Sequence, residues 1–141
     1  MGMLKTPHAL SGLFAALFIA CLCVGCSRQP PAGPATQTIN ESNDGGTIDL
    51  EVGDHLIVRL AGNPTTGYTW EREATPMPSL ILTSEKQYTP DASDTVGGGG
   101  YYQWAFQAEK VGTTNLKLIY QRPFEPDQTP AKTFVVAVQV F

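Results

Sequence analysis

Short runs of alternating apolar and polar residues constrain the fold of this chain more than any other feature. From about Gly46 to the last residue, Phe141, such runs follow one another, separated by turn-forming Gly, Pro, Asn and Asp. Alternation with a period of two places apolar side chains on one face of a β-strand, and turn signals about every 8–12 residues are typical of sandwiches and barrels. No segment keeps a helical period. The sequence therefore predicts an all-β domain.

Aromatic residues within these runs are the predicted core. Trp70, Trp104, Phe106 and Phe134 each occupy an apolar position of an alternating run. The stretch 88–100 is the exception to the pattern, because Pro90, two aspartates and four consecutive glycines make it too long for a simple hairpin. Loops of that length are usually functional or disordered.

The first 25 residues are predicted to be an export signal and not part of the fold. Lys5 supplies a positive charge, residues 9–24 are almost continuously apolar, and Gly25-Cys26 follows. This resembles a bacterial lipoprotein signal, with Cys26 as the lipidated first residue of the mature chain and Ser27 favouring an outer membrane where there are two membranes. Plain secretion and an uncleaved anchor stay open, although the apolar run is shorter than the ~20 residues of a membrane-spanning helix. Each alternative places the domain outside the cytoplasm.

Residues 26–45 are predicted to be a disordered tether, because they are rich in Pro, Ala, Gly, Gln and Thr and have no hydrophobic period. The folded domain is then expected over residues 46–141. About 95 residues suffice for one small domain with a modest core.

Composition excludes most catalytic chemistry. All three cysteines (Cys21, Cys23 and Cys26) lie in or next to the signal, so the mature domain has no disulfide and no catalytic thiol. His55 is the one histidine left, and we interpret it as a strand residue and not as a catalytic base or a metal ligand. An acid–base pair of Asp91 and Asp94 is the remaining hydrolase alternative, against their interpretation as solvated loop carboxylates. We therefore predict no enzyme, no metal and no cofactor.

Charge argues against a nucleic-acid partner. After removal of Lys5 with the signal, eight Lys and Arg face 13 Asp and Glu, and no basic stripe is present.

Three turn-rich segments are the candidate binding residues. Proline, glycine and small threonine shape their backbone, and none carries a nucleophile, a general base or a metal ligand. Each also has a plain interpretation: a turn without function, a flexible connector, and a phenylalanine packed under its own loop. The segments are Asn63, Pro64, Thr65, Thr66, Gly67 and Tyr68; Gly97, Gly98, Gly99 and Gly100; and Arg122, Pro123 and Phe124, with Pro130 following.

Taken together and in this order, the three segments resemble the chagasin family of cysteine peptidase inhibitors over about residues 46–141. One departure is Phe124, which stands where the family typically has tryptophan. The resemblance implies an immunoglobulin-like β-sandwich that presents the three loops at one end. It also implies reversible inhibition: the first loop enters the cleft of a papain-like cysteine peptidase, and the other two bind on either side. We expect the chain to be a monomer. The alternative is an immunoglobulin-like envelope lipoprotein module that binds other proteins or glycans.

Overall fold

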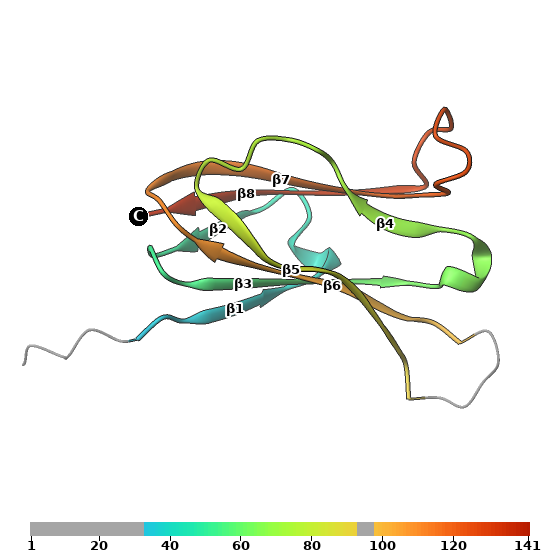
Figure 1. Ribbon diagram of the computed structural model, residues 1–141, viewed down its shortest axis with the longest axis horizontal. Helices are drawn as coiled ribbons and strands as arrows, with labels where there is room; N and C mark the ends of the chain where they lie inside the picture. The colour runs from blue at the N-terminus through green and yellow to red at the C-terminus, as the bar shows by residue number, and fades with distance from the viewer. Residues whose placement is uncertain (1–32, 93–97) are drawn as a thin grey trace, which may run out of the picture. The chain divides into compact units, whose positions relative to one another are not determined.

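The computed structural model describes residues 33–92 and 98–141 of the chain. These residues form eight strands and two short 3-10 turns (Figure 1). In chain order the elements are β1 (Thr36–Ile39), η1 (Glu41–Asn43), β2 (Thr47–Leu50), β3 (His55–Gly62), η2 (Pro64–Thr66), β4 (Thr69–Arg72), β5 (Leu80–Pro90), β6 (Gly100–Ala108), β7 (Gly112–Gln121) and β8 (Lys132–Val140).

The strands of the described part make two four-stranded sheets that face each other (Figure 1). One sheet has the order β1-β3-β6-β5, and the other has the order β2-β8-β7-β4. Neighbouring strands are antiparallel except β1 with β3 and β2 with β8, which are parallel. The expected all-β sandwich is confirmed.

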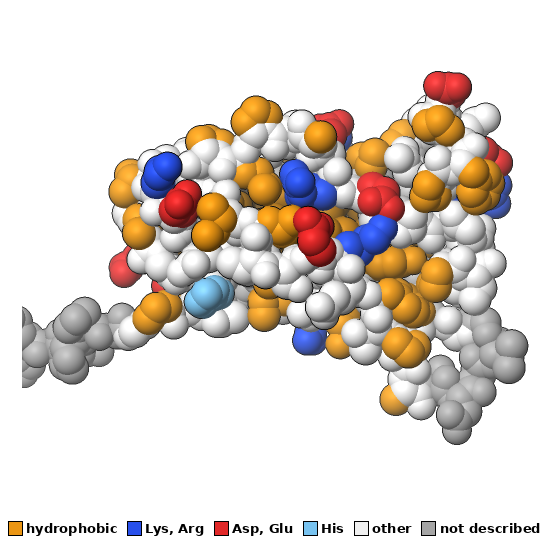
Figure 2. All heavy atoms as spheres, in the orientation of Figure 1, with side chains coloured by type: hydrophobic (Ala, Val, Ile, Leu, Met, Phe, Trp, Pro, Cys, Tyr) orange, Lys and Arg blue, Asp and Glu red, His pale blue; other side chains and the backbone are white. Residues whose placement is uncertain are grey.

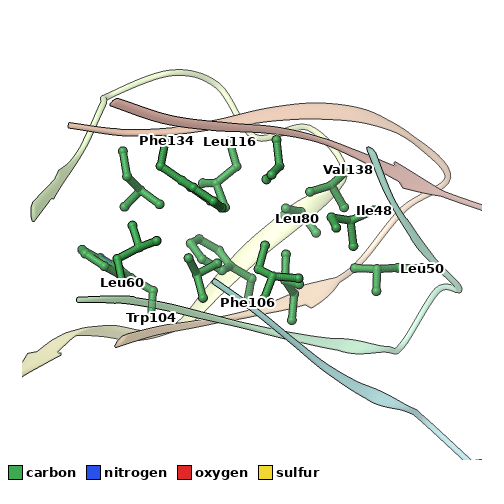
Figure 3. Close-up of a cluster of buried hydrophobic side chains, with 14 of the residues drawn as sticks. Ile48, Leu50, Leu60, Leu80, Trp104, Phe106, Leu116, Phe134 and Val138 are labelled. Atoms are coloured by element: carbon green, nitrogen blue, oxygen red, sulfur yellow. The ribbon is translucent and has the colours of Figure 1, made fainter. Parts of the chain in front are cut away.

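The core lies between the sheets and follows the predicted alternation. In β6 every second residue is buried, from Gly100 through Trp104 and Phe106 to Ala108. Side chains from the two sheets meet in the space between them (Figure 3). Trp70, Trp104, Phe106 and Phe134 are at most 2 % exposed, so their predicted place in the core is confirmed.

The fold begins earlier than the sequence suggested. Thr36–Ile39 form strand β1 and Glu41–Asn43 form η1, both within the stretch 26–45 that we expected to be a disordered tether. β1 pairs with β3 and buries Ile39, which fixes these residues to the sandwich. The expected domain start at residue 46 is therefore about ten residues too late. Residues 1–32, with the signal and Cys26, lie outside the described residues.

Only the two ends of the stretch 88–100, which looked too long for a simple hairpin, belong to strands. β5 continues through Tyr88 to Pro90, which pairs with Gly100 at the start of β6. The connection is thus residues 91–99, of which 93–97, including Asp94 and Gly97, lie outside the described residues. Across residues 33–92 and 98–141, we find no helix long and apolar enough to span a membrane.

Candidate functional site

The three candidate segments lie at the same end of the sandwich (Figure 1). The η2 loop (residues 63–68) joins β3 to β4, the β5–β6 connection has its described ends at 91–92 and 98–99, and the β7–β8 loop spans residues 122–131. A hollow of about 310 Å³ between the first two is lined in part by Asn63, Asp91, Gly99 and Lys132. Figure 2 shows hydrophobic side chains gathered at this end of the molecule.

Internal hydrogen bonds fix the η2 loop. The Asn63 side chain accepts hydrogen bonds from the Thr65 backbone nitrogen (3.0 Å) and from the Thr65 hydroxyl (2.7 Å), while the Thr66 hydroxyl donates to the Asn63 carbonyl oxygen (2.7 Å). This is an N-cap on a single 3-10 turn, with Pro64 at its first position. Gly67 closes the turn at φ +80°, a conformation that favours glycine. Thr65 and Thr66 are therefore exposed at the apex of a rigid loop.

The η2 loop and the β7–β8 loop contact each other. The guanidinium carbon of Arg122 lies 4.6 Å from the centre of the Tyr68 ring and 6.0 Å from that of the Phe124 ring. A methyl group added at Gly67 would lie 3.3 Å from the Phe124 ring. Arg122 also pairs with Glu125 at 3.6 Å. Arg122 thus braces the two loops against each other.

Phe124 is 68 % exposed, although its ring touches the η2 loop. The interpretation that it packs beneath its own loop is therefore wrong. A large apolar ring that stays this exposed beside an arginine has the composition of a binding hot spot.

The described glycines of the second segment have different environments. Gly98 and Gly99 are half-buried, and a methyl group added at Gly99 would lie 3.6 Å from the Asp91 carboxylate. Gly100 is buried, and an added methyl group would lie 2.3 Å from the Thr89 carbonyl oxygen. The requirement for glycine at position 100 therefore comes from packing within the hairpin, and a contact of Gly100 with a partner stays a prediction.

The sequence did not predict which residues of the neighbouring strands support the η2 loop. Tyr120 stacks on Tyr68, with ring centres 5.4 Å apart, and its hydroxyl accepts a hydrogen bond from the Asn63 backbone nitrogen (3.1 Å). Trp70 also packs against Tyr120, with ring centres 5.2 Å apart. Alternation placed Trp70 in the core, but it could not show that the Tyr120 hydroxyl reaches the loop or that the Trp70 indole nitrogen bonds to Ala61 at the end of β3.

Reactive groups are sparse in the part of the chain that the structure describes. Residues 33–92 and 98–141 contain no cluster of three or more His, Cys, Asp or Glu that could hold a metal ion. His55 is a partly exposed residue of β3. The pKa of Tyr88 is raised by desolvation and by the neighbouring Tyr102, which favours its neutral form.

A rigid β-sandwich that presents loops of this kind belongs to the class of immunoglobulin-like binding modules. The model of the chagasin family peptidase inhibitor I42 matches residues 49–138. The chain belongs to this family of peptidase inhibitors, and it is not an enzyme.

Relatives of known name support this membership. Amoebiasin-2 of Entamoeba histolytica is 29 % identical over 125 residues, covering 88 % of this chain and 96 % of the relative. Chagasin of Trypanosoma cruzi is 28 % identical over 102 residues, covering 70 % of this chain and 92 % of the relative.

Solved structures agree with the sequence relatives. The crystal structure of EhICP2, a cysteine protease inhibitor from Entamoeba histolytica, superposes with a TM-score of 0.70 at 27 % identity, covering 78 % of this chain and 99 % of the other. The inhibitor PbICP-C in complex with falcipain-2 superposes with a TM-score of 0.51 at 25 % identity, covering 77 % and 92 %.

Proposed function

We propose that this protein inhibits papain-like cysteine peptidases by filling the active-site cleft with the loops at one end of its sandwich. The observation that carries this proposal is the close grouping of the η2 loop, the β5–β6 connection and the β7–β8 loop in a chain of the chagasin family. The relative PbICP-C, which was solved with falcipain-2, supports a cysteine peptidase as the target.

The η2 loop is the part that enters the cleft. Thr65 and Thr66 are exposed at its apex, and both hydroxyls already donate hydrogen bonds within the loop. A loop fixed in this way loses little conformational entropy on binding. It blocks the catalytic cysteine of the peptidase without presenting a peptide bond in a geometry suited to attack. The peptidase is therefore occupied but does not cleave its inhibitor.

The other two loops bind the walls of the cleft. Gly98 and Gly99 allow close approach of a peptidase backbone, and Gly97 belongs to the same proposal although it lies outside the described residues. Phe124 supplies an apolar anchor on the opposite side, with Arg122 beside its ring and Pro123 restricting the backbone before it. A contact of standard size would bury roughly 1,600 Å² in total, and the inhibitor acts as a monomer.

Titration of papain tests this function. We expect the protein to inhibit hydrolysis of a small peptide substrate reversibly, with activity returning on dilution. The double variant Thr65→Arg, Gly99→Glu should lose inhibition and keep its melting temperature, because Thr65 is exposed and a Cβ atom at Gly99 makes only ordinary van der Waals contacts. Full papain activity at micromolar concentrations of the parent protein, repeated with several related peptidases, would contradict the proposal.

We also propose that the inhibitor is a lipoprotein of the cell envelope, attached to a membrane by a lipid on Cys26. The support is the sequence alone: a positive start, the apolar run 9–24 and Gly25-Cys26. In a cell with two membranes, Ser27 favours the outer one.

Fractionation of cells tests the attachment. The parent chain should sediment with membranes and incorporate a labelled fatty acid, whereas Cys26→Ser should do neither. Label retained by Cys26→Ser would contradict lipidation at this residue.

A further inference from the structure

Strand β3 extends beyond the end of its neighbour β1, on the side that leads into the η2 loop. β1 pairs with β3 as far as Ile39, opposite Val58, and β3 then runs on to Gly62. The His55 nitrogen donates to the carbonyl oxygen of Ala35, so odd-numbered residues of β3 turn their backbone groups toward the β1 side. Ala61 therefore presents its N–H and C=O groups where β1 has already ended.

Side chains, and not a neighbouring strand, form hydrogen bonds with these backbone groups. The Trp70 indole nitrogen donates to the Ala61 carbonyl oxygen (2.9 Å), and the Ala61 nitrogen donates to the carboxylate of Glu41. Two residues on, the Asn63 nitrogen donates to the hydroxyl of Tyr120 (3.1 Å). Backbone groups at the base of the loop are thus tied to three other elements: η1, β4 and β7.

Glu41 is itself held in place. It is the first residue of η1, which a capping box fixes: the Asn40 side chain accepts from the Ser42 nitrogen (2.9 Å), and the Asn43 side chain accepts from the Asn40 nitrogen (3.0 Å). A carboxylate that accepts from a backbone N–H forms a charge-assisted hydrogen bond, which is stronger than a neutral one. Glu41 also precedes the residues 49–138 that match the family model, so family membership does not assign it a role.

We propose that Glu41 is a positioning residue for inhibition. Its carboxylate holds the Ala61 N–H and so fixes the end of β3 from which the η2 loop begins. Fixing this base lowers the conformational entropy that the loop loses when it enters a peptidase cleft. The inference rests on the proposed function, and it extends the inhibitory unit to residues upstream of position 49.

The test compares three variants of the full chain: Glu41→Ala, Glu41→Gln and the control Glu51→Ala. Glu51 is also an exposed glutamate, and it lies beside Phe141 at the end of the sandwich away from the loops. We expect Glu41→Ala to weaken papain inhibition about 3–10-fold, mainly through faster dissociation. Glu41→Gln should recover most of the loss because its amide oxygen still accepts a hydrogen bond, and Glu51→Ala should inhibit like the parent.

Amide hydrogen exchange supplies a readout that does not depend on a peptidase. The Ala61 amide should exchange faster in Glu41→Ala, while the Asn63 amide, which Tyr120 holds, keeps its protection. Unchanged Ala61 exchange, unchanged inhibition by Glu41→Ala, or inhibition by Glu41→Gln as weak as that by Glu41→Ala would each overturn the proposal. A parent chain that fails to inhibit any peptidase would contradict the proposed function instead, and the exchange measurement would still report whether Glu41 holds Ala61.

Discussion

At the scale of single residues, Trp104 and Phe124 show two different environments for an aromatic side chain. Trp104 is 2 % exposed in the core, whereas Phe124 is 68 % exposed at the loop end. The sequence predicted this division because alternation marks Trp104 as inward-facing and Pro123 marks Phe124 as a loop residue.

Substitution of these two residues should separate stability from inhibition. Trp104→Ala should lower the free energy of unfolding by about 3–5 kcal/mol, because it leaves a cavity in the core. Phe124→Ala should leave the melting temperature nearly unchanged and weaken papain inhibition at least tenfold, as loss of a hot spot does. Thermal unfolding and inhibition assays measure both effects.

Phe141 provides the control for Phe124→Ala. It is 64 % exposed, close to the exposure of Phe124, but lies at the chain end away from the loops. Phe141→Ala should leave inhibition unchanged. Equal losses of inhibition from the two alanine variants would show that Phe124 is not a contact residue.

At the scale of elements, the sequence predicts the central strands of the sheets better than the edge strands. Strands such as β6 bury alternate residues and are visible as alternating runs. β1 buries Ile39 alone among its four residues and follows a Pro- and Gly-rich stretch, so its sequence has the composition of a tether. Its pairing with β3 depends on tertiary structure, which local sequence does not encode.

The loops show the same limit. Proline, asparagine and glycine specify the turn of η2 locally, and this part of the site could be predicted. The contacts of Arg122 with Tyr68 and of Glu41 with Ala61 join residues far apart in the chain. These contacts form only when the sandwich brings its loops and edge strands together, so the spacing of residues in the sequence could not predict them.

Coupling between the η2 loop and the β7–β8 loop can be measured with a double-mutant cycle. Tyr68→Leu and Arg122→Met each remove one partner of the stacked pair. We expect their effects on the papain inhibition constant to fall short of additivity by roughly 0.5–1 kcal/mol, the size of an exposed cation–π contact.

Arg59 is the matched control for this cycle, because its guanidinium lies 4.7 Å from the Tyr101 ring on β6. Arg59→Met removes the same charge and should combine additively with Tyr68→Leu. If Arg122→Met also combines additively with Tyr68→Leu, the two loops bind independently.

At the scale of the whole molecule, Asp54 joins the start of β1 to the turn between β2 and β3. One carboxylate oxygen accepts from the Ala35 nitrogen (2.8 Å) and the other from the Glu51 nitrogen (2.9 Å). These backbone hydrogen bonds, with a smaller contribution from His55, lower the pKa of Asp54 below its ordinary value of 3.8.

This shift predicts a pH dependence with a definite sign. A lowered pKa in the folded state stabilises the fold at pH values above the unfolded pKa, and that stability is lost as the pH falls through the folded pKa. Asp54→Asn keeps one acceptor oxygen and loses the other, so it should unfold at lower urea than the parent at pH 7. The difference should begin to shrink as the pH falls below about 3.8, the ordinary pKa, and should be smallest below the lowered pKa of the folded state. A difference that stays constant from pH 7 to pH 2 would show that the Asp54 charge does not contribute.

The parallel pairing of β1 with β3 also determines at which end of the sandwich the chain enters. β3 runs toward the loops, so the polypeptide enters the sandwich at the opposite pole, where the C-terminal residue also lies (Figure 1). A bead or a protein attached at the end of β8 therefore lies at the pole away from the η2 loop and the β7–β8 loop. Immobilised copies should capture a peptidase from solution as readily as free ones do.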